Sequence, residues 1–376
     1  MNELAALKRV DFANMFPQAT ARLNGNRETT NYGGDKFDAD SELSLTASIS
    51  WELDLWGNLR WARDRSTAEF LASVENCRAV KMGLVAQVAQ SYFELMALDN
   101  ELAIVRRTLE ARREGVRLAE IRFKGGLTSE IVFQQAKVEL AKTATMVPDL
   151  ERRISLKESE IALLTGDFPY AVNRNILPEE IQLPNALPLG LPSTLLERRP
   201  DIRKAERELM AAHAEVGLAY TNMFPRLALT ATLGTESETL RDFLKSPYSY
   251  LVGNLLSPLF AMGKNRAALK AKRAAYEGAV AEYEQTVLTA FKETHDAIIN
   301  FNKIKDIYES RRQLAEASRT AVELAQLQYI NGVIGYLDLL DAQRNYFDAQ
   351  VSLSNAVCNK QLMIINLYKA LGGGWK

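Results

Sequence analysis

The stretch "SELSLTASISWELDLWG", residues 41–57, decides the fold. Its odd-numbered residues from Leu43 to Leu55 are all apolar, and its even-numbered residues from Glu42 to Asp54 are all polar. Strict alternation of this kind predicts a β-strand with one apolar and one polar face. Strands of soluble proteins are usually about five or six residues long, whereas a tilted strand that crosses a bilayer needs about 9–11. The pattern therefore favours a membrane strand, and a hairpin of a soluble protein is the alternative.

The sequence contains an internal duplication, so that strand-like segments occur in both halves of the chain. The string Asn-Met-Phe-Pro occurs at residues 14–17 and 222–225, and a shift of about 206 residues places Gly57 on Gly263. Each half therefore has the same order of elements. We predict strands at about residues 16–25, 42–56, 225–234 and 247–260, and helices at 58–124, 128–165, 200–223, 264–329 and 337–371. The first repeat is then residues 1–166, the second is 200–376, and the proline-rich segment 167–199 is an equatorial connector.

The two longest predicted helices have the pattern of a coiled coil. Residues 58–124 contain no proline, and apolar residues recur there every seven positions, at Val88, Leu95, Leu102, Leu109 and Val116. Such a seam indicates lengthwise packing against another helix. A helix of this size would be on the order of 100 Å long.

The predicted strands are too few to close a barrel within one chain. About eight strands are the practical minimum for a barrel, and open sheet edges are not tolerated in lipid. Trp51, Trp56 and Trp61 gather toward one end of the second strand, as the residues of an interfacial aromatic belt do. Several chains would therefore share one barrel, with eight strands in a dimer or twelve in a trimer.

Four segments resemble one family of membrane proteins. They are "LLERRPDIRKAERELMAAHAEVGLAYTNMFP" at 195–225, "GYLDLLDAQRNYFDAQ" at 335–350, "LYKALGGGW" at 367–375 and "WELDLWGNLR" at 51–60. Together they resemble the TolC/OprM-like outer membrane factors, in the lipoprotein (NodT) branch that serves RND-type efflux pumps. The resemblance implies a mainly α-helical fold with membrane β-strands. Three protomers would form a twelve-strand barrel in the outer membrane, joined to a long periplasmic α-helical barrel.

The resemblance also implies a function and its partners. The chain would be the exit duct of a tripartite efflux system that works with a periplasmic adaptor, an inner-membrane RND-type pump and outer membrane lipid. Its cargo would be drugs or other small molecules, because the nine methionines form no cluster of the kind a copper-specific path would use. A soluble periplasmic coiled-coil adaptor or scaffold protein is the alternative.

The family's periplasmic gate maps onto the helix predicted at 337–371. By motif position, a leucine, an aspartate and an arginine that close the aperture correspond to Leu337, Asp341 and Arg344. Their spacing places them on one side of the helix, so we expect Asp341 and Arg344 to pair within or between protomers and to hold the aperture shut. Asp338 is a further candidate for a ring of carboxylates such as cation-selective pores contain.

The turns between the helices are the second candidate site. Gly126 and Gly332 suit the left-handed residue that ends a helix, and the resemblance implies that the tips contact the adaptor. The residues of these tips are Lys124, Gly125, Gly126, Leu127, Asn331, Gly332 and Val333. The junctions between strands and helices are marked by Phe16, Pro17, Gly57, Phe224, Pro225 and Gly263.

Composition excludes several other classes. The net charge of −1 argues against a nucleic-acid partner. Two cysteines (Cys77, Cys358) and two histidines (His213, His295) leave little room for a metal site or disulfide framework. No constellation of catalytic residues is recognisable, so we expect neither an enzyme nor a cofactor.

The N-terminus lacks features expected of the family. The first 16 residues, "MNELAALKRVDFANMF", are amphipathic and charged and do not form a secretory signal. Members of the family begin with a signal peptide and a lipid-bearing cysteine, and Cys77 lies within a predicted helix. We therefore expect an N-terminal truncation, a misassigned start site or a pseudogene product. The predicted location, the outer membrane with a periplasmic extension, applies to the intact protein.

Overall fold

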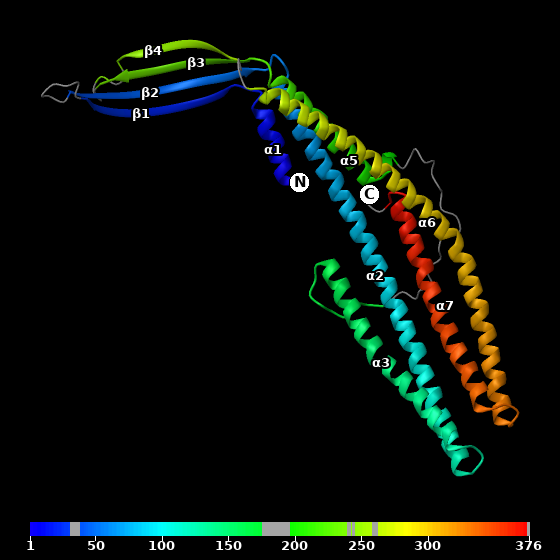
Figure 1. Ribbon diagram of the computed structural model, residues 1–376. Coiled ribbons are helices and arrows are strands. Elements are labelled where there is room, and N and C mark those ends of the chain that lie inside the picture. Colours follow the sequence, from blue (N-terminus) through cyan, green and yellow to red (C-terminus); the bar gives the residue numbers. More distant parts are fainter. Residues whose placement is uncertain (31–37, 175–195, 239–241, 243–244, 258–261, 374–376) are drawn as a thin grey trace. The chain divides into compact units, whose positions relative to one another are not determined.

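The structure, a computed structural model, describes residues 1–30, 38–174, 196–238, 242, 245–257 and 262–373 (Figure 1). Its main elements in chain order are α1 (Asn2–Ala13), β1 (Gln18–Thr30), β2 (Asp38–Leu53), α2 (Asn58–Lys124), α3 (Glu130–Thr165), α5 (Pro200–Thr221), β3 (Arg226–Ser237), β4 (Pro247–Leu256), α6 (Lys264–Ile330) and α7 (Tyr336–Ala370). The described part of the chain is thus mainly helical with four antiparallel strands, which confirms the predicted fold class.

The ends of the strands differ from the prediction by several residues. The first two strands continue until Thr30 lies opposite Asp38, because backbone pairing persists where the alternation of side chains fades. β2 ends at Leu53 rather than at 56, because the carboxylate of Asp54 accepts hydrogen bonds from two backbone N–H groups in the first turn of α2, at 3.0 and 3.1 Å. Residues 258–260 of the predicted fourth strand and 175–195 of the predicted connector lie outside the described residues.

The chain forms two compact units, and each contains parts of both sequence repeats. The first unit comprises Met1–Cys77 with Pro200–Val287, and the second comprises Arg78–Arg199 with Leu288–Lys376. The boundaries of these units therefore differ from the boundaries of the repeats. Corresponding ends of the two repeats fold together, and α2 and α6 each contribute residues to both units.

The first unit contains an antiparallel sheet with the strand order β1-β2-β3-β4 (Figure 1). Ser48 lies opposite Thr20 on one side and Thr232 on the other. The hydroxyl groups of Ser48 and Thr232 are 3.0 Å apart. Since directly paired residues point to the same face, the polar residues of neighbouring strands form one hydroxyl-rich face, and β1 and β4 are the edges of this sheet.

The apolar face of this sheet is the exposed one. Ile49 is 54% exposed and Leu233 is 66% exposed, whereas Ser44 and Thr232 on the polar face are 9% and 3% exposed. An antiparallel sheet of a soluble protein has the opposite arrangement, with its apolar face covered. An apolar outer face and a polar inner face are typical of membrane barrels.

Aromatic rings join the helices of the first unit. The indole of Trp61 in α2 lies against Gly217 in α5, where an added Cβ would be 2.4 Å from the ring. The Trp61 ring also meets the ring of His213 edge-on at 5.6 Å, and His213 lies 5.7 Å from the ring of Tyr276 in α6. The absence of a side chain at Gly217 therefore allows α2 and α5 to approach closely.

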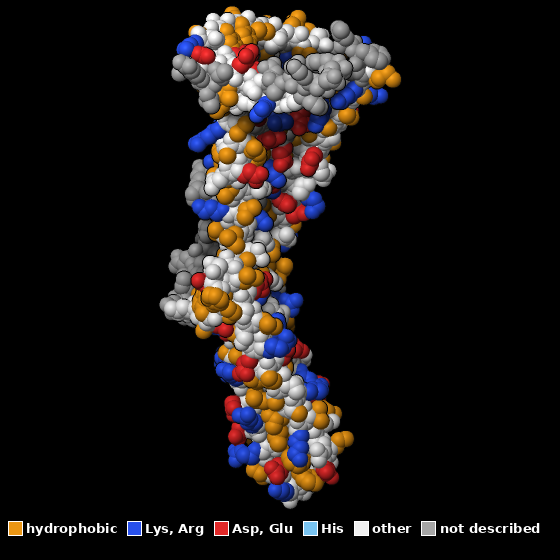
Figure 2. Space-filling view, turned by 90° about the vertical axis from the view of Figure 1, so that its left-hand side faces the viewer, with side chains coloured by type: hydrophobic (Ala, Val, Ile, Leu, Met, Phe, Trp, Pro, Cys, Tyr) orange, Lys and Arg blue, Asp and Glu red, His pale blue; other side chains and the backbone are white. Residues whose placement is uncertain are grey.

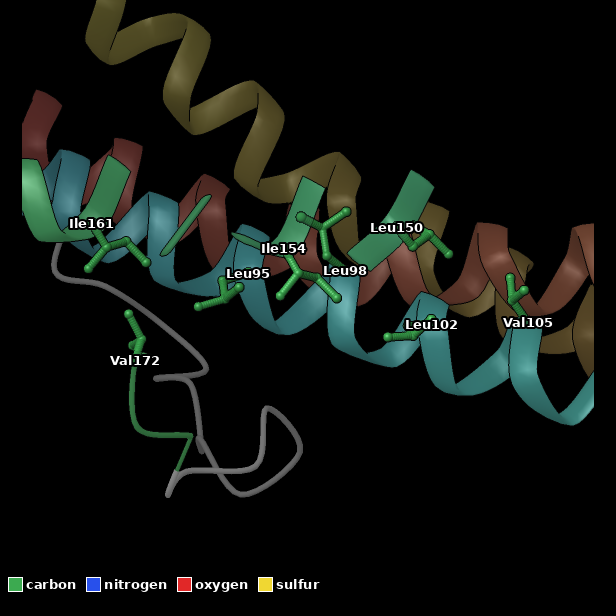
Figure 3. Close-up of a cluster of buried hydrophobic side chains, with 8 residues drawn as sticks. All are labelled: Leu95, Leu98, Leu102, Val105, Leu150, Ile154, Ile161 and Val172. Atoms are coloured by element: carbon green, nitrogen blue, oxygen red, sulfur yellow. The ribbon is translucent and has the colours of Figure 1, made fainter. Parts of the chain in front are cut away.

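The second unit is built around a seam between α2 and α3 (Figure 3). Four of its residues, Leu95, Leu98, Leu102 and Val105, lie on α2 and are buried. The other members of the cluster are Leu150, Ile154 and Ile161 of α3, together with Val172. Leu95 and Leu102 belong to the seven-residue repeat seen in the sequence, which explains why α2 packs lengthwise against α3.

A buried arginine holds the C-terminal end of α7 in the second unit. Arg199 is 4% exposed, and its guanidinium donates a hydrogen bond to the backbone carbonyl of Ala370 at 3.2 Å. It also pairs with Glu293 of α6 at 2.6 Å. The hydroxyl of Thr294 donates to the same carbonyl at 3.2 Å. A cation at a helix C-terminus satisfies free carbonyl groups and complements the helix dipole.

Charges of both signs are interspersed over the face of the helices that Figure 2 shows. Several are neighbours on one helix, such as Arg113 with Glu110 at 2.5 Å and Arg319 with Glu323 at 2.9 Å. Pairs of this spacing stabilise a helix slightly, which helps long exposed helices to persist. Among the helices that the structure describes, none combines the length and the apolar character that a membrane crossing requires.

Candidate functional site

The two helix tips of the second unit have the same backbone geometry. Gly126 and Gly332 have positive φ angles of 70° and 74°. The N–H of Leu127 donates to the carbonyl of Arg122, and the N–H of Val333 donates to that of Gln328, both at 2.9 Å. This is the hydrogen-bond pattern of a Schellman turn, in which glycine takes the left-handed position.

The predicted tip residues are placed at these turns, and several of them are exposed. Leu127 is 73% exposed and Val333 is 70% exposed. The ammonium of Lys124 pairs with Glu120 at 2.8 Å, and the amide of Asn331 donates to the carbonyl of Leu327 at 2.8 Å. Each tip therefore presents one large apolar side chain beyond a polar helix end.

Contacts between side chain and backbone join the two tips to each other. The guanidinium of Arg122 in α2 donates to the carbonyl of Tyr329 in α6 at 3.2 Å and lies 4.7 Å from the centre of its ring. The Tyr329 ring is in turn 5.8 Å from that of Tyr336 in α7. Burial, more than any neighbouring charge, raises the pKa of Tyr336.

The predicted gate residues occupy the first turns of α7. Leu337 is 57% exposed, and the side chain of Asp341 is 71% exposed. Asp338 has a local partner, because its carboxylate accepts a hydrogen bond from the N–H of Gly335 at 3.0 Å and thereby caps the helix. The predicted pair between Asp341 and Arg344 has a long N–O distance of 3.7 Å.

The shorter ion pair of Arg344 is with Glu139 of α3. Its Nη2 lies 2.5 Å from the Oε1 of Glu139. The other carboxylate oxygen, Oε2, accepts a hydrogen bond from Arg112 of α2 at 2.6 Å, and Arg112 also donates to the Glu139 carbonyl at 2.8 Å. Lys142 approaches Oε1 at 3.2 Å. One carboxylate thus connects three helices.

Burial and charge make Glu139 unusual among the carboxylates near the tips. Its side chain is 6% exposed, and that of Arg112 is 10% exposed. The pKa of Glu139 is lowered from 4.5 to about 2, mainly by the hydrogen bond from Arg344 and further by Lys142 and Arg112, against the effect of burial. Glu139 is therefore ionised throughout the physiological pH range.

Glu139 and Arg112 were missed in the sequence, although a signal was present. The buried residues of α3 include Ala136, Glu139, Thr143 and Leu150. This spacing of three, four and seven residues is that of a helix seam. A glutamate at a seam position indicates a buried charge that requires a partner, but the sequence does not name the partner.

The predicted junction residues lie where strands meet helices in the first unit. Gly57 and Gly263 have positive φ angles of 83° and 78°, just before α2 and α6. The ring of Phe224 stacks on Trp56 at 5.0 Å, and the Trp56 indole N–H donates to the carbonyl of Pro225 at 2.8 Å. The first copy is similar, since Phe16 and Pro17 directly precede β1.

The chemistry available at the tips is that of ion pairing. Within the described ranges, no three His, Cys, Asp or Glu side chains are grouped so that they could hold a metal ion. The tips carry guanidinium, carboxylate, phenol and aliphatic side chains, which form ion pairs, hydrogen bonds and apolar contacts.

Known proteins resemble this chain in both sequence and fold. A model of the outer membrane efflux protein family matches residues 4–167 and 191–373. The outer membrane protein OprJ of Pseudomonas aeruginosa is 33% identical over 381 residues, which cover 98% of this chain and 78% of OprJ. The solvent efflux pump outer membrane protein SrpC of Pseudomonas putida is 32% identical, with 98% and 80% covered. The cation efflux system protein CusC of Escherichia coli O6:H1 is 29% identical, with 100% and 82% covered.

Solved structures of outer-membrane channels also resemble this chain. The outer-membrane channel OprN has a TM-score of 0.92 at 29% identity, over 100% of this chain and 85% of OprN. A structure of CusC has a TM-score of 0.92 at 28% identity, over 99% and 87%. The long helices and the four-stranded sheet of this chain are therefore the fold of an outer-membrane channel subunit. The chain belongs to the outer membrane efflux protein family, whose members are proteins of the cell outer membrane. These matches do not favour the alternative, which was a soluble periplasmic coiled-coil adaptor or scaffold protein.

Proposed function

We propose that three copies of the chain form the exit duct of a tripartite efflux system. The observation that supports this most directly is the sheet of the first unit, whose apolar side chains are exposed and whose opposite face is rich in hydroxyl groups, of which Ser44 and Thr232 are buried. Four strands cannot close a barrel, and free edges are not tolerated in lipid. Pairing of β1 of one copy with β4 of the next would remove these edges and give a twelve-strand barrel.

The gate is proposed to lie at the start of α7. Three copies of Leu337 would form an apolar constriction, and three copies of Asp341 would form a ring of carboxylates. Asp338 would add to this ring while it caps the helix. Threefold symmetry would repeat each contact of Arg344 in all three copies. Contacts that each contribute a modest stabilisation would then together hold the aperture closed.

The exposed tips are proposed to bind the periplasmic adaptor. Leu127 and Val333 are 73% and 70% exposed at turns of identical geometry. Apolar residues surrounded by polar ones are typical of interaction sites. An inner-membrane pump of the RND type would complete the assembly.

The duct is proposed to conduct its cargo passively, without covalent chemistry or a cofactor of its own. Relatives of comparable identity are named for the efflux of solvents (SrpC) and of cations (CusC). Because one fold serves both, we propose that the pump selects the cargo, here drugs or other small molecules. A lipid anchor would be expected in the intact family member.

Conductance in planar bilayers tests this function. Detergent-extracted protein should be a trimer that inserts and shows low conductance while the gate is closed. Asp341→Ala and Arg344→Ala should each raise the conductance, because each removes one partner of the closing contacts. Asp348→Ala is the matched control, since it removes an exposed carboxylate two turns further along α7.

Two results would contradict the proposal. A purified protein that remains monomeric and does not insert into bilayers would exclude the duct. A conducting trimer in which neither Asp341→Ala nor Arg344→Ala differs from Asp348→Ala would exclude the gate.

A further inference from the structure

A cavity of about 820 Å³ lies where the helices of the first unit meet the sheet. Residues of α2, α5 and α6 form its wall together with residues at the adjoining ends of β3 and β4. Its volume is in the range of small-molecule sites, which is about 300–1,000 Å³. The predicted gate and tip residues belong to the second unit, so this cavity is a separate feature.

The cavity lies on the hydroxyl-rich side of the sheet. Arg226 of β3 and Leu256 of β4 both line it, and the two residues are directly paired. Arg226 is an even number of positions from Thr232, so both side chains point to the same face of β3. Thr232 lies opposite Ser48 on that face. This is the face proposed to line the duct, so a molecule in the cavity would lie in the path of the cargo.

Positive charge predominates in the wall of the cavity. Its cationic side chains are those of Arg65, Arg226, Lys264 and Lys272, whereas Glu215 is the carboxylate among the lining residues. Glu215 pairs with Lys272 at 2.5 Å. In the described part of the chain, no carboxylate pairs with Arg226 or Lys264. Two cations therefore remain for an anionic ligand.

Arg65 is incompletely satisfied by its neighbours. Its guanidinium lies 3.6 Å from Asp11 and 3.7 Å from Glu69, which are ion pairs longer than a hydrogen bond. Its Nε is buried and has no hydrogen-bond partner among the described residues. Because buried donors in proteins are nearly always paired, such an atom requires an explanation. An anion in the cavity would bring oxygen acceptors to this side chain.

Hydrogen bonds fix the wall of the cavity. The side-chain oxygen of Asn222 accepts a hydrogen bond from Arg226 at 2.6 Å and another from Asn58 at 3.0 Å. Asn265 donates to the backbone carbonyl of Asn222 at 3.3 Å. These contacts join the end of α5 to the starts of α2 and α6. A guanidinium that is already held in place loses less freedom when a ligand binds.

Apolar side chains form another part of the wall. Leu218, Phe224 and Leu256 line the cavity, and Leu256 is 74% exposed. Burial of this surface by a hydrocarbon group would be favourable. An inorganic anion would leave the surface exposed, and a neutral hydrocarbon would leave the cations without a partner. A ligand with an apolar body and an anionic head satisfies both parts of the wall.

We propose that this cavity binds amphipathic organic anions, such as alkyl carboxylates and sulfonates, and is a cargo site of the duct. This inference rests on the proposed duct and names a class of its cargo. The anionic head lies against Arg226 and Lys264, and the hydrocarbon body lies against Phe224 and Leu256. Threefold symmetry would place three such sites around one duct.

Calorimetric titration of the detergent-extracted trimer tests the site. Hexanesulfonate, 1-hexanol and hexylammonium have the same hydrocarbon chain and differ in the charge of the head. Hexanesulfonate should bind about tenfold more tightly than either of the others, because its head makes charge-assisted hydrogen bonds. Its affinity should fall when the KCl concentration is raised from about 0.05 to about 0.5 M, since salt screens such contacts. The affinity of 1-hexanol should not fall.

Lys264→Gln removes one charge from the cavity and keeps the length of the side chain nearly the same. It should weaken the binding of hexanesulfonate about threefold to fivefold, the effect of one solvent-accessible ion pair. The addition of Arg226→Gln should weaken binding further. Lys270→Gln is the matched control, because Lys270 is also exposed on α6 but does not line the cavity. The binding of 1-hexanol and the thermal stability should be the same in Lys264→Gln and Lys270→Gln.

Conductance in planar bilayers tests whether the site lies in the duct. Hexanesulfonate should lower the conductance of the unsubstituted trimer, because a molecule in the cavity occupies part of the path. The same concentration should have a smaller effect on Lys264→Gln and an unchanged effect on Lys270→Gln.

The outcomes distinguish the anion site from the duct itself. If the trimer conducts but hexanesulfonate binds no better than hexylammonium, or if Lys264→Gln behaves like Lys270→Gln, the anion site is wrong and the duct stands. Binding of hexanesulfonate without any change in conductance would exclude a cargo site. If no conducting trimer forms, the duct is wrong and the cargo site falls with it.

Discussion

Glu139 makes folding stability depend on pH in the acid range. Its pKa is lowered from 4.5 to about 2. A carboxylate of this kind contributes fully above a pH of about 4.5, and its contribution is lost as the pH falls toward 2. The difference corresponds to about 3 kcal/mol. The charged and titratable groups that face it from α2, α3 and α7 are Arg112, Lys142, Tyr336 and Arg344.

Urea unfolding of the trimer in detergent checks this effect. The difference in unfolding free energy between the unsubstituted protein and Glu139→Gln should be constant from pH 8 to pH 5. It should shrink by about 3 kcal/mol between pH 5 and pH 2. A difference that persists at pH 2, or that already shrinks near pH 6, would show that the carboxylate does not have this low pKa.

At the scale of single residues, local spacing was predictable and partners were not. Leu337, Asp341 and Arg344 share one side of a helix, which follows from their spacing of four and three residues. Arg344 pairs with Asp341 at 3.7 Å, as the spacing predicts, and at a shorter distance of 2.5 Å with Glu139, which lies 205 residues away on another helix. Only packing brings Arg344 and Glu139 together, so the motif indicated Asp341 but not Glu139.

At the scale of helices, Gly217 sets the distance between α2 and α5. Gly217→Ala should lower the unfolding free energy by about 1–3 kcal/mol, because the new Cβ would lie 2.4 Å from the indole of Trp61. Gly278→Ala in α6 is the control, since no atom lies within 4 Å of a Cβ there. That substitution should stabilise the protein by up to about 1 kcal/mol through helix propensity.

Thermal or chemical unfolding in detergent would measure both substitutions. Equal effects at the two glycines would mean that the approach of Trp61 to α5 does not limit stability. If both substitutions stabilise, helix propensity outweighs packing at Gly217.

The long helices could be predicted closely because glycines mark their ends. α2 spans Asn58–Lys124 and α6 spans Lys264–Ile330, each following a glycine with positive φ. Neither glycine nor proline stands at Thr30 or Asp38, the far ends of β1 and β2. Thr30 and Asp38 are paired through backbone groups, whose hydrogen bonds do not depend on side-chain alternation.

At the scale of the whole molecule, the exposed apolar face predicts which substitutions prevent assembly. Ile49 and Ser50 are neighbours in β2, both exposed in the single chain, and point to opposite faces. Ile49→Arg should cost up to about 2–4 kcal/mol when the protein folds into a bilayer, because it places a charge against lipid. Ser50→Arg should cost much less, because it faces the polar interior of the barrel.

Folding into liposomes, followed by urea titration, checks this pair. Equal tolerance of Ile49→Arg and Ser50→Arg would mean that lipid does not contact the apolar face.

The alternation of apolar and polar residues could be recognised in the sequence of residues 41–57, whereas the division of the chain into two units could not. Each unit combines residues from both repeats, and such long-range association has no local signal.

Arg199 gives α7 a fixed point at the end opposite to the proposed gate. Its contact with the Ala370 carbonyl is buried and its contact with Glu293 is partly buried, whereas Leu337 near the other end is 57% exposed. A rod that is pinned at one end works as a lever. Over the roughly 50 Å between these ends, a tilt of about 5° about Ala370 would displace Leu337 by about 4 Å. A rotation too small to disturb the packing near the pivot would therefore move the far end by the width of a side chain.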